Sequence, residues 1–128
     1  MKIYEYPIQV YYEDTDHSGV VYHANYLKYF ERAREHMLGI DDLVALYRED
    51  NVGFVVYKAD ITYQKGAVFG DKLIIRSTVL KESPYRLLFD QRAYRGDILL
   101  VQANIQLACV QHDQGLIRVP EKILNQLV

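Results

Sequence analysis

Apolar and polar side chains alternate most regularly in residues 98–111. Every odd position from Leu99 to Cys109 is apolar, while Gln102 and Asn104 stand among the even positions. Successive side chains of a strand point to opposite faces, so this alternation predicts a strand with one buried face. Cys109 falls on the apolar face, and we expect it to be a core residue.

Four further segments are rich in Ile, Val, Tyr and Thr and are bounded by turn residues, which predicts strands over residues 3–12, 52–63, 72–81 and 85–95. Pro7 indicates that the first of them lies at a sheet edge or carries a bulge. In the second, a period of two would place on one face Val55, Tyr57, Ala59, Ile61 and Tyr63. The opposite face would then hold Lys58, Asp60 and Thr62.

The spacing changes to that of a helix from about Asn25. Apolar side chains then recur at helical intervals, which predicts one buried helix face made of Tyr26, Phe30, Ala33 and Met37. Gly39 is expected to end this helix. Residues 43–46 predict a further short helical piece. Glu31 and Arg34 are expected to pair on the helix surface.

These elements follow the order strand, long helix, four strands. The later strands are joined by short turns, and short turns join antiparallel neighbours, because parallel crossovers need about a dozen residues or more. An amphipathic helix must cover an apolar surface, which one face of such a sheet supplies. We therefore predict an α+β fold with an antiparallel sheet of about five strands on one main helix, in a single domain over residues 1–128. Its edge strands are expected to pair with a second copy of the chain.

Composition narrows the class of protein. The chain has 128 residues, with 15 Lys and Arg against 17 Asp and Glu, and this net charge of −2 argues against a general nucleic-acid binder. One cysteine cannot form an internal disulfide, which fits a reducing compartment. Neither a signal-peptide core nor an apolar stretch of membrane-spanning length is visible. We therefore expect a cytoplasmic protein without membrane insertion.

The candidate chemistry is concentrated in residues 11–26, which combine carboxylates, histidines and a glycine turn. One interpretation is a metal site. Asp14 and Asp16 match the first half of a calcium-binding EF-hand loop, but its final Glu is missing. Zinc bound by Asp16, His17 and His23 would have a spacing that fits no standard ligand pattern. A second interpretation is structural, since negative charge is stabilised near the start of a helix.

Acyl transfer is a third interpretation of this loop. The free N–H groups at the start of a helix can hold a developing oxyanion. A carboxylate upstream of the Ser18-Gly19 turn can face the same spot, where it would attack an acyl carbon or activate water. A thioester is the most suitable acyl donor, because its leaving thiol ionises near pH 8.5 or so and departs without a strong acid.

Residues 11–16, 19–26 and 29–34 resemble the 4-hydroxybenzoyl-CoA thioesterase family of the hotdog superfamily, in particular its small bacterial Tol–Pal-associated acyl-CoA thioesterases of the YbgC type. Residues 69–71, Phe-Gly-Asp, are a weaker match. The resemblance spans nearly the whole chain. It implies a hotdog fold, in which the sheet wraps around one long central helix, and active sites at a dimer interface. Residues 66–68, Gly-Ala-Val, depart from the Pro-Ala of many relatives.

The same resemblance implies roles for single residues. Asp16 falls on the catalytic carboxylate, a nucleophile or general base, and His23 on the helix-start residue whose amide polarises the thioester carbonyl. Tyr12, grouped with these catalytic residues, would line the same site. Substrate contacts are expected beside the loop from Tyr22, Asn25 and Tyr26. Contacts with the phosphates of coenzyme A are expected from Lys81 and Arg86.

The predicted function is hydrolysis of an acyl-CoA, or of an acyl-carrier-protein thioester, to the free carboxylic acid and the thiol. A homodimer or homotetramer would perform it without a metal or other cofactor. The alternative is a non-catalytic hotdog scaffold linked to envelope or lipid-synthesis machinery, since a fold does not fix a function. A hotdog hydratase or dehydratase is a third possibility. The length of the acyl group, and whether it is aromatic or aliphatic, are left open.

Overall fold

The computed structural model describes residues 2–127. Within this range the strands are β1 Tyr4–Gln9, β2 Val52–Tyr63, β3 Lys72–Ser83, β4 Arg86–Arg95, β5 Ile98–Gln111 and β6 Gly115–Leu116. The helices are α1 Asn25–Leu38, α2 Ile40–Asp50 and α3 Glu121–Gln126, and a 3-10 turn, η1, spans Tyr12–Asp14.

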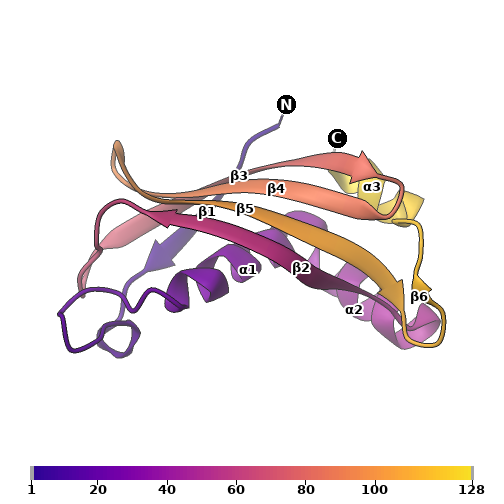
Figure 1. Cartoon of the computed structure of the whole chain (residues 1–128), viewed down its shortest axis with the longest axis horizontal. Coiled ribbons are helices and arrows are strands. Elements are labelled where there is room, and N and C mark those ends of the chain that lie inside the picture. The colour runs from indigo at the N-terminus through magenta and orange to yellow at the C-terminus, as the bar shows by residue number, and fades with distance from the viewer. Residues whose placement is uncertain (1, 128) are drawn as a thin grey trace.

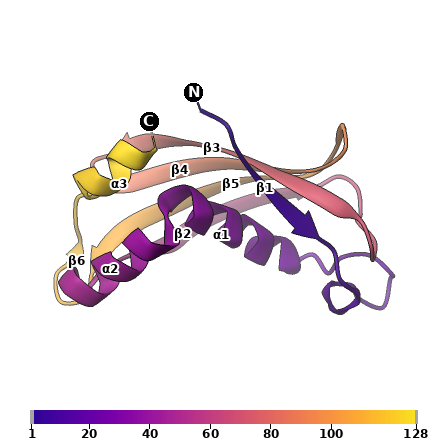
Figure 2. The same ribbon diagram turned by 180° about the vertical axis from the view of Figure 1, so that it is seen from behind.

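The strands form one antiparallel sheet in the order β1-β3-β4-β5-β2, and β6 pairs with the end of β5. The sheet curls, and α1 and α2 lie against its concave side, as Figures 1 and 2 show from opposite directions. This arrangement confirms the predicted α+β class and its five main strands. β1 and β2 are the two edges of the sheet, in agreement with the presence of Pro7 in β1.

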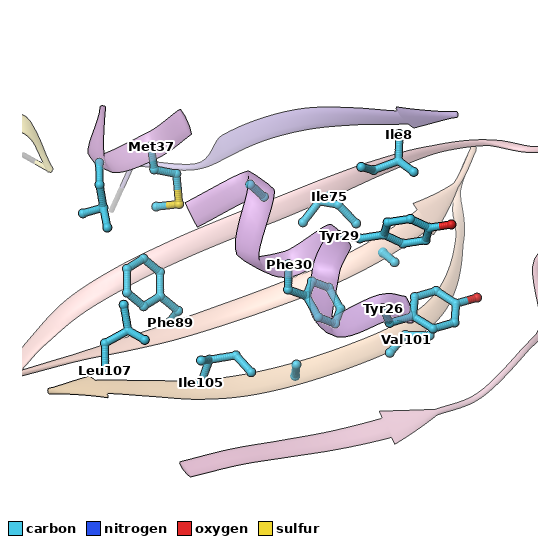
Figure 3. Close-up of a cluster of buried hydrophobic side chains, with 14 of the residues drawn as sticks. Ile8, Tyr26, Tyr29, Phe30, Met37, Ile75, Phe89, Val101, Ile105 and Leu107 are labelled. Atoms are coloured by element: carbon cyan, nitrogen blue, oxygen red, sulfur yellow. The ribbon is translucent and has the colours of Figure 1, made fainter. Parts of the chain in front are cut away.

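The face of α1 that covers the sheet is the one that the helical spacing predicted. Its buried residues include Tyr26, Phe30, Ala33 and Met37, and Figure 3 shows Phe30 and Tyr26 among side chains of the strands. Fully burying a large apolar side chain contributes roughly 1.5–3 kcal/mol. Gly39 ends α1 with a φ of 93°, which glycine adopts without strain. α2 follows directly with 11 residues, so the helical piece predicted at 43–46 is longer than expected.

Arg34 is buried, and the prediction that it pairs with Glu31 on the helix surface is wrong. Only 6% of Arg34 is exposed, and its Nη1 donates a hydrogen bond to Oε1 of Gln91 in β4 at 2.9 Å. Among residues 2–127 it takes part in no salt bridge. Arg34 follows Phe30 by four residues, so it lies on the same buried face of α1.

The buried face of β5 holds the predicted apolar residues from Val101 to Cys109. Leu99 is the exception: Leu100 is buried in its place, because the register with β4 shifts at this point. Cys109 is a core residue as expected, and burial raises the pKa of its thiol to about 11. The thiol is therefore protonated at neutral pH, which makes it a poor nucleophile.

A bulge at Tyr57 corrects the face pattern predicted for β2. The pairing of β2 with β5 skips one residue between Val56 and Lys58. A shift of one residue exchanges the two faces of a strand. Val56 therefore shares the face of its buried partner in β5, and Val55 lies on the opposite face. Beyond the bulge the prediction holds for Ala59, Ile61 and Tyr63.

The two ends of the described chain also differ from the sequence-based picture. β1 stops at Gln9 instead of residue 12, and η1 follows it. The helix α3 was not predicted. It lies near the start of α2, where Lys122 Nζ is 3.1 Å from a carboxylate oxygen of Asp42 and Gln126 donates to the same carboxylate. No helix within residues 2–127 has both the length and the apolar character needed to span a bilayer.

Candidate active site

The chain forms a small hairpin just before α1. Thr15 and Val21 make an isolated antiparallel bridge, and the N–H of Asp16 donates to the carbonyl of Val20 at 3.0 Å. The hairpin lies between the end of β1 and the start of α1, at the end of the sheet where β2 finishes (Figure 1). Its backbone pairing holds the polar side chains of the loop in place.

Asp14 stabilises this hairpin through three hydrogen bonds. Its carboxylate accepts the backbone N–H of Tyr11 at 2.8 Å, and its carbonyl accepts both the N–H of Tyr22 and Nδ2 of Asn25 at 2.9 Å. The side chain of Asn25, predicted to contact substrate, is therefore engaged in holding the loop. Burial, together with the neighbouring Asp14 carboxyl, raises the pKa of Tyr29 on α1.

Asp16 presents an exposed carboxylate on this loop. One of its oxygens accepts the N–H of Ser18 at 2.8 Å. Its carbonyl accepts the N–H of Gly19 at 2.9 Å, and Gly19 makes the turn with a φ of 82°. No second side-chain hydrogen bond to Asp16 is formed within residues 2–127, so one carboxylate oxygen is oriented and the other is free to react.

His23 lies at the entry to α1 with an exposed side chain. In the described part of the chain, its backbone N–H donates to no acceptor. Its carbonyl accepts the hydroxyl of Tyr63 at 3.0 Å. His23 directly precedes Ala24, the N-cap residue of α1, and the N-terminal end of the helix dipole favours negative charge there. The amide of His23 can therefore receive an external oxyanion.

Aromatic rings surround His23. The ring centroids of Tyr22 and His23 are 4.6 Å apart, and the ring of Tyr63 meets that of His23 edge-on at 6.0 Å. Tyr26 is buried, with 2% exposed. A hollow of about 250 Å³ is lined by His23, Tyr26, Tyr63 and Lys65. Tyr22 and Tyr26 thus lie beside His23, where substrate contacts were predicted.

Tyr63 was not assigned to the site from the sequence. The only signal was its position at the end of the predicted strand, on the same face as Ile61. Its hydroxyl reaches His23 because β2 ends beside the hairpin, which the strand pattern alone does not show. Burial raises the pKa of the Tyr63 hydroxyl, so it remains a hydrogen-bond donor at neutral pH.

A second loop, before β3, borders the hairpin. The ring of Tyr12, 77% exposed on η1, lies 5.9 Å from that of Phe69. This loop is held by Asp71, whose carboxylate accepts the N–H of Val68 and Nη1 of Arg95, each at 2.9 Å. The hydrogen bonds from Val68 and Arg95 lower the pKa of Asp71.

Lys81 and Arg86 lie near the β3–β4 turn, at the opposite end of the sheet from Asp16 (Figure 1). The guanidinium of Arg86 stacks 4.7 Å above the ring of Tyr57, and its Nη1 donates to the Tyr57 hydroxyl at 3.3 Å. A single chain therefore does not bring Lys81 and Arg86 together with Asp16 and His23. Their contact with coenzyme A stays a prediction.

Within residues 2–127, no group of three or more His, Cys, Asp and Glu side chains is arranged to hold a metal ion. The calcium and zinc interpretations of the loop therefore lack the ligand cluster that they need. What the loop does offer is a carboxylate with a free oxygen and an amide without an acceptor. No hydrogen bond joins Asp16 to His23 in the described residues, so both groups can engage a third molecule.

The chain is similar in sequence to named thioesterases. The model of the thioesterase-like superfamily matches residues 10–127. The acyl-CoA thioesterase YbgC of Haemophilus influenzae is 39% identical over 109 residues, which cover 84% of this chain and 80% of that protein. The acyl-CoA thioester hydrolase YbgC of Escherichia coli O157:H7 is 39% identical over 111 residues, covering 84% and 82%.

Solved structures extend the likeness to the fold. A hypothetical protein from Thermus thermophilus is 31% identical, with a TM-score of 0.84, over 96% of this chain and 95% of its own. A 4-hydroxybenzoyl-CoA thioesterase has a TM-score of 0.91 over the full length of both chains, and at 16% identity it supports the fold alone. These findings confirm the resemblance drawn from the sequence. The chain therefore belongs to the thioesterase-like superfamily and has its hotdog fold.

Proposed function

We propose that this protein hydrolyses acyl-CoA thioesters to a carboxylic acid and coenzyme A. The relatives named above as acyl-CoA thioesterases support the substrate class. The observation that carries the proposal is the pairing, on one hairpin, of the Asp16 carboxylate with the unused amide of His23 at the start of α1.

Asp16 supplies the nucleophile or the general base. As a base, it removes a proton from water while the water oxygen bonds to the thioester carbon. The C–S bond then breaks, and the proton passes to the departing thiolate. As a nucleophile, it forms an acyl anhydride with loss of the thiol, and water then cleaves the anhydride to return the carboxylate. In both routes the thiol leaves readily, since its pKa is about 8.5.

His23 stabilises the oxygen that becomes negative in either route. A hydrogen-bond donor placed at that oxygen is worth about 10²–10³ in rate in other acyl-transfer enzymes. The donor here is a backbone group, so the role does not depend on the imidazole. Tyr63 supports it, because its hydroxyl holds the carbonyl of the same residue. Tyr12 and Tyr22 form walls beside the reacting group.

The active form is proposed to be a homodimer joined along β2. This edge strand exposes three consecutive large side chains by nearly half, Val55, Val56 and Tyr57. Exposed edge strands of this kind readily pair with another strand. An antiparallel pair of β2 strands would set the beginning of one strand beside the end of the other. Lys81 and Arg86 would then reach coenzyme A bound at the site of the partner copy.

The deciding experiment measures thiol release from a panel of acyl-CoA and acyl-carrier-protein thioesters. We expect wild-type turnover on at least one acyl-CoA and a loss of about 10²-fold or more in Asp16→Asn, in the range typical for removing an acid–base group. Glu13→Gln is the matched control, because Glu13 is an exposed carboxylate on the same loop. Equal rates in Asp16→Asn and wild type would remove Asp16 from the mechanism.

Two additional measurements, an assay of enoyl-thioester hydration and co-purification, separate the alternative functions. Hydration of an enoyl thioester without thiol release would identify a hydratase or dehydratase. A wild-type protein that acts on no thioester, yet co-purifies with a tight partner, would be a scaffold. Preferred turnover of the carrier-protein thioesters would change the donor but not the chemistry.

A further inference from the structure

A groove runs between α1 and β2 beyond the candidate active site. Two hollows, of about 270 and 240 Å³, follow each other along it and share Glu31, Arg34 and Val56. Apolar side chains supply much of the first hollow, with Leu27 and Ile105 among them. The groove therefore has the shape and lining to take an alkyl chain, and Arg34 stands at the junction of its two hollows.

Arg34 is oriented by a buried polar network. Its Nη1 donates to Oε1 of Gln91 at 2.9 Å, while Nε2 of Gln91 donates to the carbonyl of Phe30 and to Oγ of Ser77, both at 3.0 Å. Gln91 is fully buried, with 0% exposed. Because both ends of its amide are engaged, Gln91 cannot turn away, and it holds the guanidinium at the side of the groove.

The guanidinium has donors left over. It carries five N–H groups, and Gln91 is the one hydrogen-bond acceptor that it contacts within residues 2–127. Within residues 2–127, no nitrogen of the Arg34 side chain is both buried from solvent and without a hydrogen-bond partner. Arg34 lines both hollows, and its remaining donors are not sealed off from them. An oxygen of a molecule bound in the groove can therefore accept a hydrogen bond from the guanidinium.

The charge of the groove indicates which acceptor suits it. The first hollow is lined by Lys28, Glu31 and Arg34 and has a formal charge of +1, whereas the second has a formal charge of −1. In the second hollow one arginine, Arg34, faces Glu31 and Glu35. An added carboxylate would be repelled by these two side chains. A neutral oxygen, on a hydroxyl or an oxo group, would accept from Arg34 without that repulsion.

We propose that Arg34 is a specificity-determining residue that binds a hydroxyl or oxo oxygen on the distal part of a long acyl chain. The inference rests on the proposed function, whose site it extends. Arg34 follows Asn25, the first residue of α1, by nine residues, about 14 Å along the helix. The oxygen bound there is therefore remote from the thioester, and short acyl groups do not reach it.

The test compares kcat/KM for dodecanoyl-CoA with that for its ω-hydroxy and ω-carboxy derivatives. For the wild type we expect the ω-hydroxy chain to be preferred over the plain chain by about ten- to hundredfold, as for a hydrogen bond to a charged donor, and the ω-carboxy chain to gain less. In Arg34→Met the preference should fall to about one. Each ratio is taken within one protein sample, so partial loss of folded protein does not affect it.

Two further variants keep the test decisive. Lys28→Met removes an exposed cation that borders the same groove, and it should leave the preference of the wild type intact. Arg34→Lys keeps the charge but loses the planar fork, and an intermediate preference is expected. A wild type without preference, or an Arg34→Met protein that retains it, would overturn the proposal.

Binding separates this inference from the proposed function. Calorimetry of free dodecanoic acid and ω-hydroxydodecanoic acid needs no hydrolysis. Tighter binding of the hydroxy acid, lost in Arg34→Met, would uphold the role of Arg34 even if no thioester were cleaved. If Arg34 instead pairs with a carboxylate of a second copy, Arg34→Met will dissociate the dimer while the wild type shows no hydroxyl preference. That outcome would also overturn the proposal.

Discussion

Single hydrogen bonds determine how the candidate site is aligned. The Tyr63 hydroxyl joins the end of β2 to the carbonyl of His23, the residue whose amide is proposed to hold the oxyanion. Asp14 stabilises the hairpin that precedes His23, because it accepts hydrogen bonds from Tyr11 and Asn25. The position of the amide therefore depends on a few polar contacts, of which the one from Tyr63 comes from a segment distant in the sequence.

Tyr63→Phe should lower kcat by about fivefold, because a neutral hydrogen bond is worth about 1 kcal/mol, and should change KM less. Steady-state kinetics on the best acyl-CoA of the panel would measure both. Tyr94→Phe is the matched control, since Tyr94 lies on β4 and lines neither the hollow of His23 nor those of the groove. If the two variants behave alike, the bond from Tyr63 to His23 does not position the amide.

Asp71 predicts a pH effect at the neighbouring loop. Hydrogen bonds from Val68 and Arg95 lower its pKa in the folded state. A depressed carboxyl pKa stabilises the fold above the unfolded pKa, about 3.9, and this contribution is lost as the pH falls through the folded value.

Asp71→Asn should therefore lower the unfolding midpoint at pH 7, and its difference from wild type should shrink below about pH 4. Thermal unfolding across this pH range measures the effect. Asp97→Asn serves as a control on an exposed turn. A deficit of Asp71→Asn that stays constant down to pH 2 or so would contradict the assignment.

At the scale of elements, the loops carry constraints that the regular strands and helices do not. Gly66 lies in the loop before β3. A Cβ at this position would come 2.8 Å from Cγ1 of Val20 in the hairpin. The absence of a side chain at Gly66 thus lets the two loops approach each other.

Gly66→Ala should destabilise the protein by about 1–3 kcal/mol, the usual cost of overpacking. Gly53→Ala is the control, because a Cβ there meets nothing within 4 Å, and replacing a strand glycine should be neutral or stabilise by about 0.5–1 kcal/mol. Chemical unfolding would measure both. Equal stability of the two variants would mean that Val20 yields without cost.

The sequence predicted the elements better than their contacts. Phe30 and Met37 revealed the buried face of α1 because helical spacing is a local property. Arg34 was placed on the surface because it is charged. Its spacing from Phe30 instead puts it on the buried face, and in the structure it is buried. In β2 the period of two failed at Tyr57, because a bulge depends on pairing with a distant strand.

For the molecule as a whole, the open question raised by the fold is what covers β2. One face of the sheet is closed by α1 and α2 (Figure 2), while the outer edge of β2 has no neighbouring strand within residues 2–127. The groove of Arg34 and the hollow of His23 both lie along this edge. A second copy would therefore close the substrate site as well as the sheet.

Val55→Lys should weaken the proposed dimer by at least about tenfold, because a lysine on an edge strand opposes pairing. Light scattering over a dilution series would show the change in mass. Val68→Lys is the control: Val68 is 44% exposed, close to the 46% of Val55, but lies outside the sheet. A monomeric wild type, or the same dilution curve for both variants, would refute the β2 interface.

The sequence by itself determined the α+β class, the limits of α1, the presence of the five main strands and the loop that bears Asp16 and His23, because each rests on spacing between near neighbours. The tertiary structure alone decided which groups meet. It brought Tyr63 to His23, set Arg34 on Gln91 and left Arg86, the first residue of β4, at the other end of the sheet. These outcomes depend on the register of the strands and on the position of α1 against the sheet. Both arise from contacts between residues far apart in the chain.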